Sequence, residues 1–461
     1  AAAAPEATRT LDAMGPKAKG MKFTMAVSPL DCMGCTNCVK VCPKGALEMV
    51  PTEQEMDQQP VWDYMVENVS EKKELIAANV KGSQFKQPYL EFSGSCAGCA
   101  ETAYARLVTQ VAGDRMFISN ATGCSSIWGN PAATAPYCKD KDGHGPAWNN
   151  SLFEDNAEHG LGMYLGQKAI RERLIAQVKS MAESDQASES FKAAFQAFLD
   201  TKDDSTANAP AAKALIAELE KAAAEGCPVA PAVLAEKEYL SKKSVWIFGG
   251  DGWAYDIGFG GVDHVLASGE DVNVFVFDTE VYSNTGGQAS KASNIGQVAQ
   301  FAAAGKTIAK KSLAEIAMTY GYVYVAQVAM GANMNQTLKA IAEAEAYHGP
   351  SLIIGYAPCE MHSIKGGMTN CQGEMKKAVE CGYWNLFRFN PALKAEGKNP
   401  FTLDSKAPAG GYQEFLMNEA RYASLTRSFP ERAEELFKEN EQAAMDRYAH
   451  LLKLKTVYNE A

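Results

Sequence analysis

The feature that most constrains this chain is a run of cysteines near its start. Cys32, Cys35, Cys38 and Cys42 follow the pattern C-x2-C-x2-C-x3-C, and a proline comes next. In this pattern the first three thiolates bind one [4Fe–4S] cube and the fourth binds a second cube. Both cubes lack ligands here, because no second C-x2-C-x2-C run exists in the sequence. The chain also begins at Ala1, so we expect a longer polypeptide divided within an electron-transfer domain.

Composition restricts the classes of function that the chain could have. Its 461 residues leave room for two or three domains. The net charge of −11 argues against a nucleic-acid-binding protein, which would need a basic surface. No segment approaches the roughly 18 apolar residues of a membrane span. The start, AAAAPEATRT, does not have the regions of a secretory signal. Most of the twelve cysteines have metal-type spacings rather than a disulfide framework, which predicts a reducing cytoplasm.

The texture of the sequence divides the chain into four segments. The first carries the cysteine run, the second is a polar connector, the third alternates between strand and helix patterns, and the last is a charged helical tail. A stretch rich in Ala, Lys and Glu predicts a helical insertion without chemistry inside the third segment. The predicted bounds are 1–55, 56–90, 91–430 and 431–461, with the insertion at 165–240.

Apolar segments separated by a helix predict a parallel sheet. Residues 244–250 (SVWIFGG) and 272–278 (VNVFVFD) are typical of buried strands, and residues 253–268 suit a helix between them. Further helices and strands are predicted in alternation at 313–320, 323–328, 335–347 and 351–356. The predicted fold class is therefore α/β, a parallel-sheet domain with a helical insertion, preceded by part of a domain with two [4Fe–4S] cubes.

The ends of the first two predicted strands carry a pattern typical of thiamine diphosphate sites. The first ends in Gly250-Asp251-Gly252, and the second runs into DTEVYSN at 278–284. Glycines let the backbone approach a diphosphate, and the following helix offers its N–H groups to phosphate oxygens. Asp251 supplies a hard oxygen for Mg²⁺, at the sheet edge where α/β folds bind ligands. Gly-Asp-Gly alone is as often an ordinary turn, but the flanking strands favour a cofactor site.

Four further cysteines lie among small residues. Cys96 and Cys99 form a C-x2-C, Cys124 lies in NATGCSS, and Cys359 ends YAPC after an apolar segment. By chemistry alone four thiolates could bind zinc or a [4Fe–4S] cube, and a redox-active pair or buried free thiols would also fit. Small neighbours leave backbone N–H groups free to bond cluster sulfides. An electron-transfer segment on the same chain favours the cube.

At these motifs the sequence resembles the pyruvate:ferredoxin oxidoreductase family, specifically the C-terminal part of the long single-chain bacterial enzymes. The matching segments are DCMGCTNCVKVCP, FSGSCAGCAET, NATGCSSIWG, KSVWIFGGDGWAYDIG, VFDTEVYSNTGGQAS and YAPC. The resemblance implies that the four cysteines just described bind a [4Fe–4S] cluster beside thiamine diphosphate. It also implies that Asp251, Thr279 and the backbone of Val281 bind Mg²⁺, and that Asn284 and Glu101 take part in catalysis. The implied lining of thiamine diphosphate is Glu101, Cys124, Gly250, Asp251, Gly252, Trp253, Thr279, Glu280, Val281, Tyr282, Ser283 and Asn284.

The activity that the resemblance implies is the oxidative decarboxylation of pyruvate with coenzyme A to acetyl-CoA and CO2. Electrons would pass one at a time through three [4Fe–4S] clusters to ferredoxin or flavodoxin. The family's N-terminal domains do not occur in this sequence, and they supply the remaining pyruvate, thiamine and coenzyme A contacts. We therefore expect no turnover from this stretch alone. A homodimer is expected, in the cytoplasm and without nucleic acid or membrane.

Several alternatives remain open at this stage. The substrate could be 2-oxobutyrate, 2-oxoisovalerate or 2-oxoglutarate, because the deciding pocket lies mostly upstream. An electron-transfer module with an empty thiamine fold is disfavoured by intact Asp251, Thr279 and Asn284. A non-redox thiamine decarboxylase or synthase would leave eight cluster-type cysteines without a purpose. Residues predicted to have no special role are Cys138, Cys227, Cys371, Cys381, His144, His159 and His362.

Overall fold

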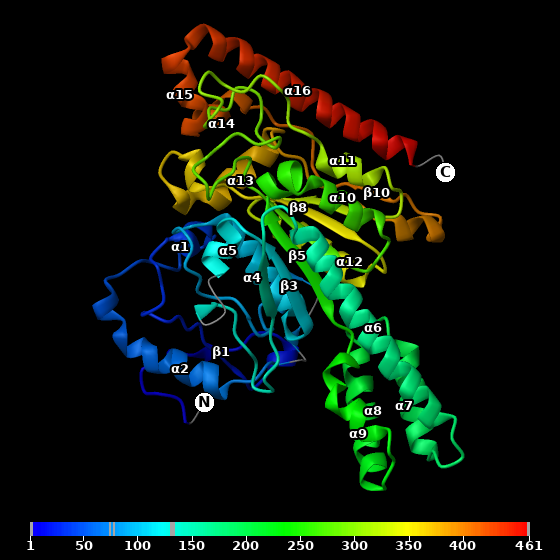
Figure 1. Ribbon diagram of the computed structural model, residues 1–461. Coiled ribbons are helices and arrows are strands. Elements are labelled where there is room, and N and C mark those ends of the chain that lie inside the picture. The colour runs from blue at the N-terminus through cyan, green and yellow to red at the C-terminus, as the bar shows by residue number, and fades with distance from the viewer. Residues whose placement is uncertain (1–2, 73–74, 77–78, 130–133, 459–461) are drawn as a thin grey trace.

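The computed structural model describes residues 3–72, 75–76, 79–129 and 134–458. The extreme ends of the first and last predicted segments, and parts of the predicted connector, lie outside the described residues. The described chain forms a sheet domain with an N-terminal segment beside it and a bundle of helices projecting from it (Figure 1).

The centre of the fold is a mostly parallel sheet, as the sequence predicts. In the described part of the chain it has eight strands in the order β10-β9-β7-β8-β6-β5-β3-β4. The neighbours from β7 to β4 are parallel, and β9 and β10 are antiparallel at one edge. The strands are β3 (Met116–Ala121), β4 (Ala147–Ser151), β5 (Ser244–Gly250), β6 (Asn273–Asp278), β7 (Tyr324–Val328), β8 (Ser351–Tyr356), β9 (Phe387–Phe389) and β10 (Phe401–Leu403).

Helices cover both faces of this sheet, which explains the continuous apolar runs of its central strands. Successive residues of a strand point to opposite faces, so Ile247 of β5 and Phe275 of β6, which are offset by one position in register, face opposite sides. Helix α6 packs closely against the face that carries Ile247: a Cβ added to Gly160 of α6 would lie only 2.4 Å from Cγ1 of Ile247. The ring of Tyr104, on α4, lies 5.3 Å from that of Phe275. The helices of the domain are α4 (Ala100–Ala112), α5 (Cys124–Gly129), α6 (Asn156–Ala182), α10 (Phe259–Ala267), α11 (Leu313–Met318), α12 (Met334–Ala346) and α13 (Cys371–Glu380).

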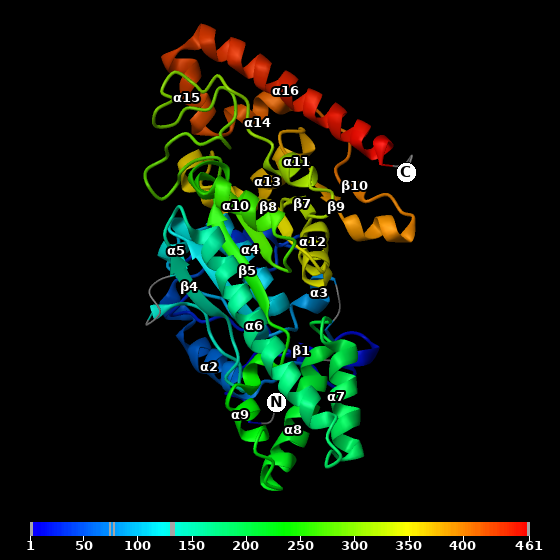
Figure 2. The same ribbon diagram turned by 45° about the vertical axis from the view of Figure 1, so that its right-hand side comes forward.

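The segment predicted as a helical insertion contains helices with a small core of their own, and its bounds as an insertion stay a prediction. It consists of the second half of α6 with α7 (Glu189–Thr201), α8 (Asn208–Ala224) and α9 (Ala230–Ala235). Ser188 caps α7 by accepting a hydrogen bond from the N–H of Phe191. These helices extend away from the sheet (Figure 2). The buried side chains of this core include Leu174, Val178, Phe191, Phe198, Leu215 and Leu219.

The N-terminal segment is loosely built and lies against the sheet domain. It contains the hairpin of β1 (Leu11–Asp12) and β2 (Lys22–Phe23), and the short helix α1 (Asn37–Val41), which carries Cys38. Helices α2 (Gln59–Asn68) and α3 (Val80–Ser83) occupy part of the predicted connector. The amide of Asn37 lies 3.5 Å from Sγ of Cys371, so the cysteine loop contacts the start of α13.

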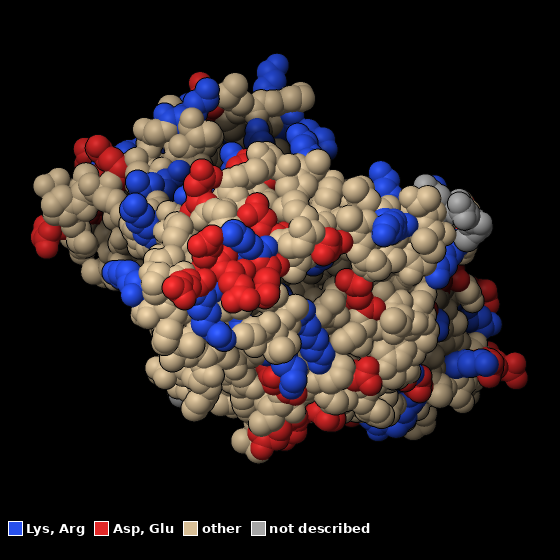
Figure 3. All heavy atoms as spheres, turned by 90° about the horizontal axis from the view of Figure 1, so that it is seen from above, with Lys and Arg blue, Asp and Glu red and all other residues tan. Residues whose placement is uncertain are grey.

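The C-terminal helices complete the main core. They are α14 (Tyr412–Met417), α15 (Ala420–Ser428) and the long α16 (Pro430–Val457). One side of α16 buries Leu436, Phe437 and Leu451 in the same core as the sheet, and its other side is charged. Seen from the end that α16 crosses, acidic side chains gather in a patch near the middle of the face, and basic side chains lie around it (Figure 3). No helix among the described residues is long and apolar enough to cross a membrane.

Candidate cofactor site

The predicted site residues follow four neighbouring strands at the same edge of the sheet. Strands β3, β5, β6 and β8 are parallel and adjacent. Their carboxyl ends lead into Cys124, Asp251, Thr279 and Cys359 respectively. Carboxyl ends of parallel strands meet at one edge, so segments that are far apart in the sequence converge there.

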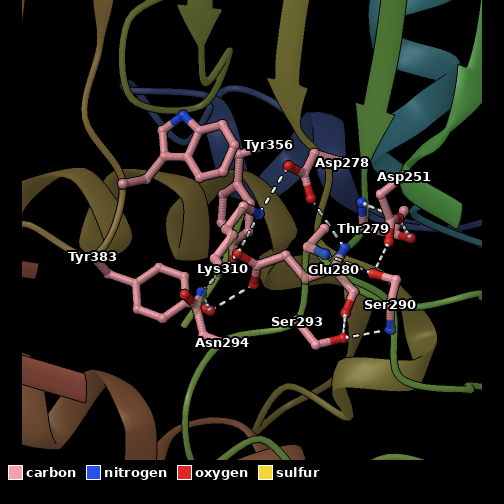
Figure 4. A network of polar contacts seen from close by, with 12 residues as sticks. Asp251, Asp278, Thr279, Glu280, Ser290, Ser293, Asn294, Lys310, Tyr356 and Tyr383 are labelled. Carbon is pink, nitrogen blue, oxygen red and sulfur yellow. Dashed lines mark hydrogen bonds and ion pairs between the residues drawn. The ribbon is translucent and has the colours of Figure 1, made fainter. Parts of the chain in front are cut away.

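Three oxygen atoms form a compact group after β5 and β6. Thr279 Oγ1 lies 2.9 Å from Asp251 Oδ1 and 3.0 Å from the carbonyl oxygen of Val281. The N–H of Thr279 also donates to Asp251 Oδ1, and Ser290 Oγ donates to Oδ2 at 2.5 Å (Figure 4). An octahedral Mg²⁺ with ligands at about 2.1 Å has edges of about 3.0 Å between neighbouring oxygens. The spacing and the chemistry of this donor set fit magnesium.

The carboxylate of Asp251 is in an environment that favours a bound cation. Its side chain is fully buried, and burial together with the nearby charge of Asp278 raises the pKa of Asp251 to about 8. An acid with so high a pKa is readily protonated when nothing positive is beside it. A divalent cation at this oxygen would replace that proton and keep the group ionised.

One cavity brings together the four predicted cluster thiols and the end of β6. It has a volume of about 120 Å³, and its walls include Thr279 and Asn284 as well as the indole of Trp128. Cys124 Sγ lies 3.2 Å from Ser283 Oγ, so this thiol contacts the segment that follows Thr279. The other predicted residues in its wall are Cys96, Cys99, Cys124, Cys359 and Glu101. The thiols are therefore grouped rather than scattered.

Burial keeps three of the cavity thiols, Cys99, Cys124 and Cys359, neutral unless a positive centre binds them. Desolvation, with a contribution from the charge of Glu101, raises the pKa of Cys99 and Cys124 far above the usual value. The pKa of Cys359 is raised to about 12, again chiefly by burial. Thiolates in this cavity therefore require a metal centre to stabilise their charge. Among the described residues, no three His, Cys, Asp or Glu side chains converge at the spacing of a single-ion site.

Glu101 is a buried acid in the wall of the same cavity. It lies in the first turn of α4, and burial raises its pKa to about 7. Trp128 Nε1 donates to Glu101 Oε2 at 2.8 Å and opposes that shift. Glu101 can therefore hold or release a proton near neutral pH.

Three residues of the predicted lining point their side chains elsewhere. Trp253 is fully buried and packs against Gly249 and Gly258. The carboxylate of Glu280 lies in a buried ion network, and the ring of Tyr282 packs edge-on against Phe153. Their predicted contact with thiamine diphosphate stays a prediction. Gly250 has open space at its Cβ position, with its nearest neighbour 3.9 Å away.

The N-terminal cysteines do not form a centre within the described residues. Cys32 and Cys38 are exposed, and Cys35 and Cys42 are partly exposed. Sγ of Cys42 accepts the N–H of Ala46 at 3.3 Å, and such backbone bonds lower its pKa. Their role as cluster ligands stays a prediction.

Two contacts at the site could not be found from the sequence. Ser290, which donates to Asp251, is 39 positions away and ends the VFDTEVYSNTGGQAS segment, but nothing in that string indicates its partner. Trp128, which bonds Glu101, is part of the NATGCSSIWG segment, but nothing in that string indicates its partner.

Comparisons with known proteins match both the sheet domain and the N-terminal segment. Residues 216–354 match the family described as thiamine pyrophosphate enzyme, C-terminal TPP binding domain, and residues 25–48 match the 4Fe-4S binding domain. The chain is 54% identical over 98% of its length to a pyruvate:ferredoxin oxidoreductase of Moorella thermoacetica, and covers 39% of that protein. It is 52% identical over 98% of its length to a pyruvate-flavodoxin oxidoreductase of Klebsiella pneumoniae, of which it covers 38%. The chain is also 46% identical, over 97% of its length, to a mitochondrial pyruvate dehydrogenase [NADP(+)] of Euglena gracilis, and it covers 25% of that protein.

Proposed function

The chain is homologous over nearly its whole length to a part of the pyruvate:ferredoxin and pyruvate-flavodoxin oxidoreductases, and from this we propose that it forms the thiamine- and cluster-bearing portion of such an enzyme. The complete protein converts pyruvate and coenzyme A to acetyl-CoA and CO2. It passes the two electrons singly to ferredoxin or flavodoxin. The chain spans about two fifths of these relatives, with coverages of 39% and 38%, so the remaining domains contribute the rest of the site.

The observation that carries this proposal is the shared cavity. Four thiols, a buried acid and the end of β6 line a single space of about 120 Å³. A cube binds its four thiolates through four separate irons, which suits four thiols that line one cavity. A centre held there is next to whatever is bound at Asp251 and Thr279, so single electrons have a short path.

The chain's own residues hold and orient the reacting groups. Asp251, Thr279 Oγ1 and the carbonyl of Val281 would hold Mg²⁺, whose charge would attract the diphosphate. Thiamine diphosphate, when bound, supplies the electron sink that a 2-oxo acid needs in order to lose CO2. Asn284 lines the same cavity, and its amide would bond a substrate oxygen there. Glu101 holds a proton at its carboxyl group, oriented by Trp128.

The electron path leads from the cavity towards the N-terminal segment. Cys96, Cys99, Cys124 and Cys359 hold the first cube. Cys32, Cys35 and Cys38 bind a second, and Cys42 binds a third, whose other ligands lie in the rest of the protein. The loop that carries them contacts the start of α13, through Asn37 and Cys371. We further propose a homodimer in the cytoplasm, with pyruvate preferred over other 2-oxo acids.

The test is metal and activity analysis of the full-length protein with matched cysteine variants. The wild type should contain roughly twelve irons per chain from three four-iron cubes, together with bound thiamine diphosphate. It should also reduce a viologen dye only when pyruvate and coenzyme A are present. Cys359→Ser should lose about four irons and this activity, whereas Cys381→Ser, a buried thiol outside the cavity, should keep both.

Two results would overturn the proposal. Zinc in place of the cavity iron would remove the redox role, and protein without thiamine diphosphate would favour a pure electron-transfer module. Activity that is greater with another 2-oxo acid than with pyruvate would reassign the substrate.

A further inference from the structure

A buried ion network lies behind the turn at 279–281, which carries two of the oxygens proposed to bind Mg²⁺. Its members are charged or polar, belong to segments far apart in the sequence, and are buried among the main core (Figure 4). The charged members are Asp278, Glu280, Lys310, Glu419 and Arg421. With Asp251, the network contains four carboxyl groups and the two cationic side chains of Lys310 and Arg421.

Glu280 occupies the critical position in this turn. The backbone φ of Glu280 is +60°, a left-handed conformation that residues other than glycine rarely adopt. It lies between Thr279 and Val281, whose hydroxyl and carbonyl oxygens are 3.0 Å apart. The reversal of the backbone at Glu280 is what places these two oxygens together beside Asp251. Such a conformation persists only when the surroundings hold it.

Four donors hold the carboxylate of Glu280. Oε1 accepts from Lys310 Nζ at 3.0 Å and from Asn294 Nδ2 at 2.9 Å. Oε2 accepts from Arg421 Nη1 at 2.7 Å and from the hydroxyl of Tyr383 at 2.5 Å. Both oxygens are therefore fixed by one cation and one neutral donor each, which leaves the side chain a single position.

The backbone on either side of Glu280 is held as well. Its own carbonyl oxygen accepts from Ser293 Oγ at 2.5 Å and from Gln297 Nε2 at 3.1 Å. The carbonyl oxygen of Thr279 accepts from His362 Nε2 at 2.7 Å. The backbone N–H of His362 donates to the carbonyl oxygen of Cys359, so this residue links the turn to the loop that carries the cysteine.

We propose that Glu280 is a positioning residue for magnesium: its carboxylate, held by Lys310 and Arg421, stabilises the left-handed turn that directs the Thr279 and Val281 oxygens at Asp251. Glu280 does not touch the cation or the substrate itself. This inference rests on the proposed function, because it assumes that Mg²⁺ and thiamine diphosphate bind at this turn.

The test measures how much Mg²⁺ the full-length protein needs to bind thiamine diphosphate after both have been removed. Glu280→Gln keeps the shape of the side chain but loses its charge, and it should raise the Mg²⁺ concentration for half-maximal binding by about 10–100-fold, as supporting residues at metal sites do. Glu280→Asp keeps the charge and tolerates a positive φ better, so it should lie between Glu280→Gln and the wild type. Iron content should not change in either variant.

Glu343→Gln is the matched control. Glu343 of α12 forms an ion pair at 2.8 Å with Arg388 of β9, the strand next to β7. Neither residue lines the cavity. This control should lower the thermal stability without changing the Mg²⁺ requirement. If Glu280→Gln does not fold, Arg421→Lys removes the planar fork that bonds Glu280 and should raise the Mg²⁺ requirement instead.

The inference is wrong if a folded Glu280→Gln protein, or Arg421→Lys in its place, needs no more Mg²⁺ than Glu343→Gln. A wild-type protein that binds no thiamine diphosphate at any Mg²⁺ concentration contradicts the proposed function itself, and so the two failures are distinguishable.

Discussion

Replacing Gly252 by alanine tests why the Gly-Asp-Gly turn needs its last glycine. A Cβ on Gly252 would lie 2.6 Å from Cδ1 of Tyr282 and 2.7 Å from Cε1, whereas ordinary contact begins at 3.4 Å. The ring cannot move freely, because it packs against Phe153 with centroids 5.7 Å apart. Overpacking of this kind costs about 1–3 kcal/mol. We expect Gly252→Ala to lower the free energy of unfolding of the 461-residue chain by that amount.

A double-mutant cycle with Tyr282→Ala isolates the role of the ring. Gly252 begins a π-helical turn and is not among the glycines with positive φ, so its backbone tolerates alanine. Without the ring, the alanine should stabilise the chain by about 0.4–1 kcal/mol through the unfolded state. The effect should therefore change sign, with a coupling energy of about 1.4–4 kcal/mol in urea unfolding. Equal effects of Gly252→Ala in both backgrounds would refute the steric explanation.

Three further predictions concern the cation, the insertion and pH. Asp251→Asn keeps the side-chain shape but loses the charge, so the full-length protein should retain iron and lose thiamine diphosphate on desalting; retention of both would contradict the magnesium assignment. Phe198→Ala in the insertion core should lower the free energy of unfolding by about 3–5 kcal/mol in urea, and a change in thiamine diphosphate affinity would contradict the separation of this core from the site. Burial and the charge of Lys310 lower the pKa of Lys306 to about 8 in the folded chain, below its usual value of 10.5. The unfolded chain therefore binds more protons between these pH values, so stability should rise with pH across this window. Lys306→Met should lose that rise in urea titrations, and an unchanged slope would refute the shift.

The sheet could be predicted from the sequence where its buried strands are continuous apolar runs, but not at β3, whose MFISNA sequence mixes apolar and polar residues. Strands β5, β6 and β8 are continuous apolar runs, and their observed bounds differ from the predicted ones by at most one residue. The edge strands could not be predicted, because β4 is polar and β9 and β10 have three residues each. The tertiary environment decides the structure of such segments more than their own composition.

The site could be predicted as a set of motifs but not as a set of contacts. Motif spacing indicated Asp251, Thr279 and the cysteines, because the order of strands places such residues at one edge of the sheet. Which residues pair with one another could not be predicted from the sequence. Glu280 and Arg421 are 141 positions apart, and His362, which has no motif, bonds the carbonyl of Thr279. Buried ion networks of this kind depend on three-dimensional packing alone.

The central claim is that the cavity thiols hold an iron cube beside a magnesium-anchored cofactor. Anomalous-difference maps of crystals of the full-length protein, loaded with thiamine diphosphate and with Mn²⁺ in place of Mg²⁺, test it most directly. We predict iron density enclosed by Cys96, Cys99, Cys124 and Cys359, and a manganese peak between Asp251, Thr279 Oγ1 and the carbonyl of Val281. A zinc peak at the thiols, or manganese elsewhere in the protein, would contradict the account.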